Sequence, residues 1–178
     1  MSILTLSPSF NALSFGIPWQ ITWFTEVQID FGKPFDRLTL FGAIEKYAGV
    51  DVSQMDEDAL RKQAKAFHIE VDESMGIGKL IDEIFGAKVE EHLVHPTFIM
   101  DYPVSMSPLT KKHRDNPELT ERFELIINGK EIANCYSELN DPIDQRERFE
   151  EQTKLLERGD DEAMFIDQDF LRALEYGM

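Results

Sequence analysis

The feature that most constrains the fold is the dipeptide Asn128-Gly129, which lies between two strand-like segments within residues 122–138. Asn-Gly is the pair that most readily adopts the two positive φ angles of a two-residue hairpin turn. The sequence therefore predicts a β-hairpin here, and a fold that contains an antiparallel sheet.

The rest of the chain is predicted to supply further strands and helices. Strands are predicted at residues 25–31, where polar and apolar residues alternate, and at residues 97–100. N-cap residues, terminal glycines and the i, i+3, i+4 spacing of apolar residues predict five helices. They are expected between Thr39 and Gly49, from Ser53 to Phe67, after Gly78 to Gly86, from Asp141-Pro142 toward Arg158-Gly159, and from Gln168 to Tyr176. The predicted fold is α+β, with a partial antiparallel β-sheet flanked by helices.

Composition limits the class of protein. The chain has 178 residues, which suits one globular domain. Its 34 acidic and 18 basic residues give a net charge of −16, which disfavours a main role in gripping a phosphate backbone. The single cysteine cannot form an internal disulfide, so a cytoplasmic protein is expected. The apolar residues 1–24 lack the basic start of a signal peptide and contain Pro8, Gly16 and Pro18, so no membrane contact is expected.

The hairpin carries two carboxylates that spacing places near each other. With the turn at Asn128-Gly129, Ile126 is expected opposite Glu131 and Glu124 opposite Ala133. Glu124 and Glu131 then lie on one face, where like charges repel unless a cation or a proton intervenes. One interpretation is a Mg²⁺ site that holds ATP through its phosphates. The other is a pair of solvated carboxylates on an open sheet face, and spacing alone leaves both open.

The second strand of the hairpin carries three residues that could bind an ammonium group. Asn134, Tyr136 and Glu138 alternate along the strand and so share one face. They offer an amide, a ring and a carboxylate. Strict alternation would place Glu131 and Asn134 on opposite faces. We therefore predict a β-bulge near Ile132-Ala133, which would bring them to the same face.

Residues 120–149 resemble the bacterial class II lysyl-tRNA synthetases, and residues 95–109 and 159–165 extend the resemblance. The resemblance implies a class II aminoacyl-tRNA synthetase-like fold, with lysine favoured by the run 137–140, Ser-Glu-Leu-Asn. It also implies the reaction: ATP activates lysine to lysyl-adenylate, and the lysyl group then passes to tRNA. No covalent nucleophile is needed, so no catalytic residue is assigned, and none to Cys135.

The same resemblance assigns roles to the hairpin residues. Glu124 and Glu131 would bind the metal that accompanies ATP. Asn134, Tyr136 and Glu138 would contact the lysine substrate, with Glu138 facing its ammonium. The implied ligands are lysine, ATP and Mg²⁺.

The resemblance also sets expectations about the extent of the chain. Residues 25–178 are expected to be part of a catalytic domain, without the family's phosphate-binding arginine motifs or its anticodon-binding domain. Residues 1–24 match nothing in the family and are expected to be disordered or an artefact. A fragment without activity of its own is expected, although tRNA binding and a homodimer belong to the family. Two alternatives remain open: a non-catalytic, synthetase-derived interaction module, and a paralogue that lysylates a protein.

Overall fold

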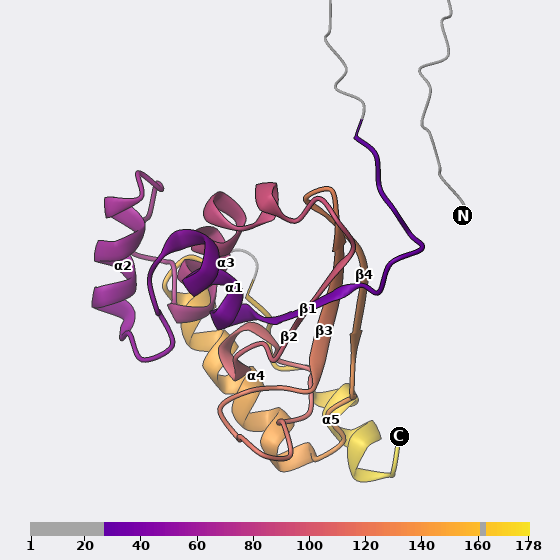
Figure 1. Ribbon diagram of the computed structural model, residues 1–178. Coiled ribbons are helices and arrows are strands. Elements are labelled where there is room, and N and C mark those ends of the chain that lie inside the picture. Colours follow the sequence, from indigo (N-terminus) through magenta and orange to yellow (C-terminus); the bar gives the residue numbers. More distant parts are fainter. Residues whose placement is uncertain (1–26, 161–162) are drawn as a thin grey trace, which may run out of the picture.

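The computed structural model describes residues 27–160 and 163–178 (Figure 1). The expectation for residues 1–24 therefore lies outside the described residues. Four strands form one sheet in the order β1-β2-β3-β4: β1 Asp36–Thr39, β2 Thr97–Met100, β3 Arg122–Ile127 and β4 Lys130–Tyr136. The α-helices are α1 Leu40–Ala48, α2 Glu57–Ala66, α3 Ile77–Lys88, α4 Pro142–Glu157 and α5 Gln168–Glu175. Two short 3₁₀ helices are η1 Glu90–His92 and η2 Val104–Met106.

The sheet and its helices confirm the predicted α+β class. β3 pairs with β2 and with β4 in antiparallel fashion, whereas β1 runs parallel to β2. The sheet is therefore mixed, with its antiparallel part around β3. The predicted hairpin is confirmed, because Asn128 and Gly129 have φ angles of 53° and 66°, as a two-residue turn with both central residues at positive φ requires.

The core lies between one face of the sheet and the N-terminal helices. Ile99 of β2 and Ile126 of β3 are at most 2% exposed. They join buried residues of α1, α2 and α3: Leu40, Ala43, Ile44, Leu60, Ala64, Leu80, Ile81, Ile84 and Phe85. Figure 1 shows these three helices gathered on one side of the sheet. Burial of this apolar face fixes which side of β3 points toward the helices.

The opposite face of the sheet carries a row of aromatic side chains. The ring of Phe98 lies 5.8 Å from that of Phe35 and 5.4 Å from that of Phe123, between ring centres. Because successive strand residues point to opposite faces, Phe98 and Phe123 face away from Ile99 and Glu124. The helix-facing side of β3 therefore carries Glu124, and the aromatic side does not.

The strand predicted at residues 25–31 is wrong in position, because β1 is Asp36–Thr39. Residues 27–31 hold only an isolated bridge at Asp30, and the strand starts at Asp36, beyond Pro34. Val27 and Phe31 are both 41% exposed. Alternation shows that a segment suits a half-buried strand, but a strand also needs a partner edge. That partner, β2, pairs with Asp36–Thr39. Residues 25 and 26 of the predicted strand lie outside the described residues.

The helix predictions are confirmed where a cap is local. The Thr39 side chain accepts a hydrogen bond from Gly42 N at 3.0 Å, and Gly49 ends α1 in the left-handed conformation. Asp141 and Asp167 cap α4 and α5 as predicted. α3 starts at Ile77 and runs past Gly86 to Lys88. The predicted start of the second helix at Ser53 is wrong, since Asp56 caps α2 by accepting from Ala59 N at 2.9 Å.

Candidate functional site

The β3–β4 hairpin contains the predicted bulge. Ile126 pairs with Glu131, and the register then shifts, so that Leu125 pairs with Ala133 and Glu124 with Asn134. Ile132 is the extra residue, which confirms the bulge expected near Ile132-Ala133. The expected pairing of Glu124 with Ala133 is wrong, because that count left out the extra residue which the bulge inserts.

The bulge brings most of the predicted site residues to one face of the hairpin. Glu124 lies opposite Asn134, and the next pair on the same face is Arg122 with Tyr136. The pair Ile126–Glu131 lies on this face toward the turn. Glu124 is only 9% exposed, whereas its partner strand β4 is mostly exposed to solvent. The face therefore offers one buried carboxylate with accessible polar groups beside it.

Arg122 lies at one end of this face and was not among the predicted site residues. Its guanidinium forms an ion pair with Glu124, and its Nε donates to Asn134 Oδ1 at 3.2 Å. The amide of Asn134 donates in turn to Glu124 Oε1 at 3.4 Å. The signal for Arg122 was present in the sequence, since it precedes Glu124 by two residues on a strand and so shares its face.

Tyr102 closes the buried side of this cluster. The Arg122 guanidinium lies 4.4 Å from the centre of the Tyr102 ring, within cation–π distance. Burial raises the pKa of the Tyr102 phenol, and the nearby charge of Glu124 raises it further. The buried phenol oxygen of Tyr102 has no hydrogen-bond partner in the described part of the chain.

Glu138 lies beyond the two strands that carry the rest of the predicted site. It follows the end of β4 and forms an isolated bridge with Thr110. Tyr136 lines an open cavity of about 530 Å³ with Arg122 and Glu121, and Glu138 is not among its lining residues. The structure thus brings Glu124, Asn134 and Arg122 into direct contact. It places Glu131 and Tyr136 on the same face. Glu138 follows on a segment that pairs with the loop residue Thr110.

Comparison with known proteins identifies the family. A family model described as "tRNA synthetases class II (D, K and N)" matches residues 11–178. The chain belongs to this family. It is 65% identical over 153 residues to a lysine–tRNA ligase of Porphyromonas gingivalis and 65% identical over 155 residues to one of Christiangramia forsetii. A lysine–tRNA ligase of Azobacteroides pseudotrichonymphae is 62% identical over 153 residues.

These matches cover most of the chain and a minor part of each relative. They span 86%, 87% and 86% of this chain, in the same order, and 26%, 27% and 31% of the relatives. The chain thus spans about a quarter of the length of the relatives it matches. Within the described residues, no helix is both long and apolar enough to cross a membrane.

Near the hairpin, two carboxyl groups have pKa values that neighbouring carboxylates raise. Burial raises the pKa of Glu90, and the charges of Asp82, Glu124 and Glu131 raise it further. Burial likewise raises the pKa of Asp82, with Glu124 adding to the effect and Lys79 opposing it. Glu124 and Glu131 therefore act on the same acidic environment, which a cation would stabilise.

The donor set fits a metal that arrives with a nucleotide. Among residues 27–160 and 163–178, no group of three or more His, Cys, Asp or Glu side chains could hold a metal alone. Glu124 and Glu131 supply carboxylate oxygens, which Mg²⁺ prefers, but two residues leave most of an octahedral shell open. Phosphate oxygens and water would have to supply the remaining ligands.

The raised pKa of Glu90 leads to a pH-dependent prediction. Glu90→Gln is expected to stabilise the fold at neutral pH by a few tenths of a kcal/mol, because the partly exposed carboxylate lies among like charges. A carboxyl whose pKa is raised on folding costs stability above that raised pKa, and the cost disappears below the pKa of the unfolded chain. The advantage of Glu90→Gln should therefore shrink as pH falls toward about 4.

Urea unfolding at several pH values measures this difference. Glu91→Gln is the matched control, since Glu91 is the next residue and its side chain is 75% exposed. An advantage of Glu90→Gln that stays constant as pH falls would contradict the electrostatic explanation.

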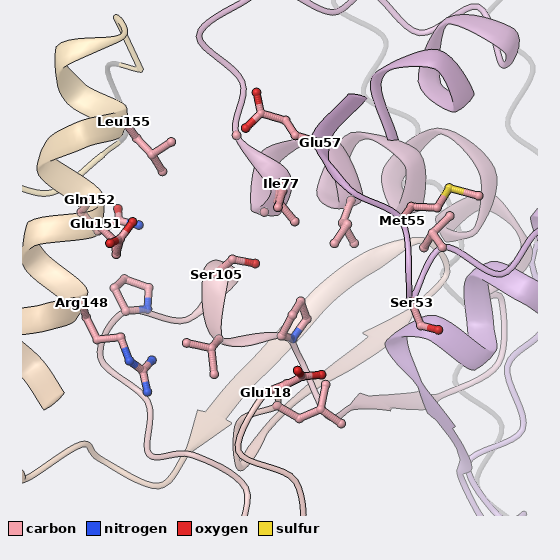
Figure 2. Close-up of a pocket in the computed structure, with 18 of the residues that line it drawn as sticks. Ser53, Met55, Glu57, Ile77, Ser105, Glu118, Arg148, Glu151, Gln152 and Leu155 are labelled. Carbon is pink, nitrogen blue, oxygen red and sulfur yellow. The ribbon is translucent and has the colours of Figure 1, made fainter. Parts of the chain in front are cut away.

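A larger cavity than the one beside Tyr136 lies elsewhere in the fold. It measures about 860 Å³ and lies between the α2–α3 region and α4, as Figure 2 shows. None of the predicted site residues lines it.

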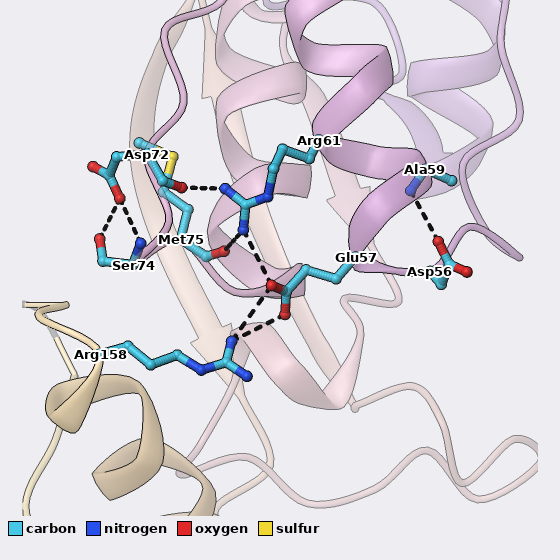
Figure 3. A network of polar contacts seen from close by, with 8 residues as sticks. All are labelled: Asp56, Glu57, Ala59, Arg61, Asp72, Ser74, Met75 and Arg158. Carbon is cyan, nitrogen blue, oxygen red and sulfur yellow. Dashed lines mark hydrogen bonds and ion pairs between the residues drawn. The ribbon is translucent and has the colours of Figure 1, made fainter.

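At one side of this cavity, Arg158 of the α4 C-terminus pairs with Glu57 at 3.1 Å, and Glu57 also pairs with Arg61 at 3.1 Å (Figure 3). The Arg61 guanidinium further donates to Met75 O at 2.8 Å, so this network joins α2, the segment before α3 and α4.

Proposed function

We propose that this chain supplies part of the active site of a lysine–tRNA ligase. The reaction joins the lysine carboxylate to the α-phosphate of ATP with release of pyrophosphate, and then transfers the lysyl group to a ribose hydroxyl of tRNA with release of AMP. The observation that carries the proposal is the bulged hairpin, which places Asn134 opposite Glu124 in a chain 62–65% identical to lysine–tRNA ligases. The proposal includes a cytoplasmic location, tRNA as the acceptor and a homodimeric assembly.

Each hairpin residue has a role in this proposal. Asn134 and Tyr136 contact the lysine substrate, and Glu138 faces its ammonium group, where a carboxylate compensates the charge. Glu124 and Glu131 face the metal that accompanies ATP. When bound, Mg²⁺ would offset phosphate charge. The contribution of the protein is to orient the two substrates and to place fixed charges beside them.

The position of Glu138 gives the proposal a definite geometric requirement. Its backbone neighbours are held by the preceding loop: Lys111 N donates to Ser137 O at 2.8 Å, and Leu139 N donates to Leu109 O at 2.9 Å. The exposed side chain is therefore attached to a segment whose backbone is fixed, and the proposal requires it to reach a ligand that also contacts Tyr136.

Calorimetry with three amino acids tests the proposal. The chain is expected to bind lysine more tightly than ornithine or glutamate, with and without Mg²⁺–ATP. Glu138→Ala is expected to weaken lysine binding by about 10- to 100-fold, because a hydrogen bond to a charged group contributes about 1.5–3 kcal/mol. Glu147→Ala, which removes an exposed carboxylate of α4, is the control. Equal responses to all three amino acids would end the lysine assignment.

A further inference from the structure

Arg122 contacts both Glu124, which is proposed to hold the metal, and Asn134, which is proposed to contact lysine. Its side chain is only 15% exposed and lies against the Tyr102 ring. The guanidinium donates to Met106 O at 2.9 Å and to Ser107 Oγ at 3.0 Å on the segment around η2. It also pairs with Glu124 and donates to Asn134. The side chain is therefore fixed by the η2 segment on one side and touches both functional groups of the hairpin on the other.

The contacts on Glu124 show what a cation bound at its Oε1 would have to replace. The Arg122 guanidinium and the Asn134 amide both donate to the same atom, Glu124 Oε1. An oxygen that accepts two hydrogen bonds has little remaining capacity for a metal. Arg122 already supplies a positive charge beside a carboxylate that also faces the charges of Asp82 and Glu90.

We propose that Arg122 is a positioning residue that orients Asn134 for lysine and serves as the counter-ion of Glu124 until a divalent cation takes its place there. This inference rests on the proposed function of the hairpin. It differs from a merely structural role in one respect. Loss of the guanidinium should change the affinities for metal and for lysine in opposite directions.

The two opposite effects have separate causes. Without Arg122, the Glu124 carboxylate has no fixed cation beside it to compete with a metal, so a divalent cation should bind more tightly. Two charges about 4 Å apart interact by several kcal/mol in a partly buried site, which supports a gain of at least about tenfold. Without the Nε donor, Asn134 loses the contact that orients its amide. Lysine binding should then weaken by about tenfold, the value of one hydrogen bond.

Mn²⁺ and lysine are the probes. The free Mn²⁺ signal in electron paramagnetic resonance measures metal binding without nucleotide, and calorimetry measures lysine binding. The comparison uses the full chain as wild type, Arg122→Met and Arg122→Lys. Arg172→Met is the matched control, because Arg172 is a 66% exposed arginine of α5 that pairs with Asp169 at 3.2 Å. We expect Arg122→Met to bind Mn²⁺ at least about tenfold more tightly and lysine about tenfold more weakly, with Arg172→Met unchanged.

Arg122→Lys separates charge from geometry. A lysine keeps the positive charge but lacks the planar fork that reaches two acceptors at once. This variant should bind Mn²⁺ as the wild type does and still lose affinity for lysine. If Arg122→Met does not fold, this split in Arg122→Lys decides the question.

The outcomes distinguish this inference from the proposed function. Wild type that binds lysine selectively, with Arg122→Met showing unchanged affinities or two changes in the same direction, would overturn the role of Arg122 and leave the proposed function standing. Wild type without lysine binding would count against the proposed function. In that case Mn²⁺ binding that is tighter in Arg122→Met would still support the counter-ion role, and no tightening would overturn it.

Discussion

Arg148→Met is expected to lower the free energy of unfolding by about 3–5 kcal/mol, the range found when one member of a buried ion pair is removed. The Arg148 side chain is 7% exposed and pairs with Asp144, with Nε 3.0 Å from Oδ1. It also donates to Ser107 O at 3.2 Å. Methionine fills much of the same volume, so the loss would come from Asp144 and from the Ser107 carbonyl, which are left without this donor.

The surroundings of Asp144 suggest the lower part of this range. Lys112 Nζ lies 3.2 Å from Asp144 Oδ1 and would still compensate its charge. Burial raises the pKa of Asp144, but hydrogen bonds and charges from Arg148 and Lys112 outweigh it, so the pKa lies below its usual value. Without Arg148 that pKa should rise, and the variant should lose stability at a higher pH than the wild type on acidification.

Urea unfolding of Arg148→Met beside Arg172→Met measures the effect. Both substitutions remove an arginine from an ion pair within a helix, but the pair of Arg172 is exposed, with side chains 66% and 91% accessible. Arg172→Met should therefore change the free energy of unfolding by less than about 1 kcal/mol. A loss of the same small size in Arg148→Met would show that its contacts with Asp144 and Ser107 contribute little.

The elements that could be predicted from the sequence are those whose signals are local. The turn at Asn128-Gly129 and the caps at Thr39, Asp141 and Asp167 depend on backbone angles or on contacts within a few residues. The first strand failed for the opposite reason. Its position depends on the edge of β2, about sixty residues later in the chain, and alternation carries no information about that partner.

The candidate site was predictable to the extent that strand periodicity determines it. Requiring Glu131 and Asn134 to share a face led to the bulge, which the register confirms. The prediction of the site left out Arg122, because the repulsion between Glu124 and Glu131 was expected to require a bound cation. The positive charge beside Glu124 comes instead from Arg122, a side chain on the same face. Tyr102 and Glu90 could not have been found by spacing, because they reach the hairpin from segments distant in sequence.

Phe149→Ala is expected to lower the free energy of unfolding by about 3–5 kcal/mol, as substitutions of buried aromatic residues by alanine do. Phe149 of α4 is 1% exposed, and its ring centre lies 6.0 Å from that of Phe170 in α5. It is not a residue of the main core between the sheet and the N-terminal helices. Its removal should therefore act mainly on the contact between α4 and α5 (Figure 1).

The length of α5 makes this contact decisive for the C-terminal end of the structure. An isolated helix of 8 residues is not stable in water, so α5 depends on the burial of Leu171 and Leu174 and on packing against Phe149. Amide hydrogen exchange should therefore show that Phe149→Ala loses protection in α5 before it does in β3, as expected of a unit that opens locally. Phe165→Ala is the control, because Phe165 is 70% exposed and should leave both regions unchanged. Equal loss of protection in α5 and β3 would mean that α4 and α5 unfold only together with the sheet, and that Phe149 belongs to one cooperative core.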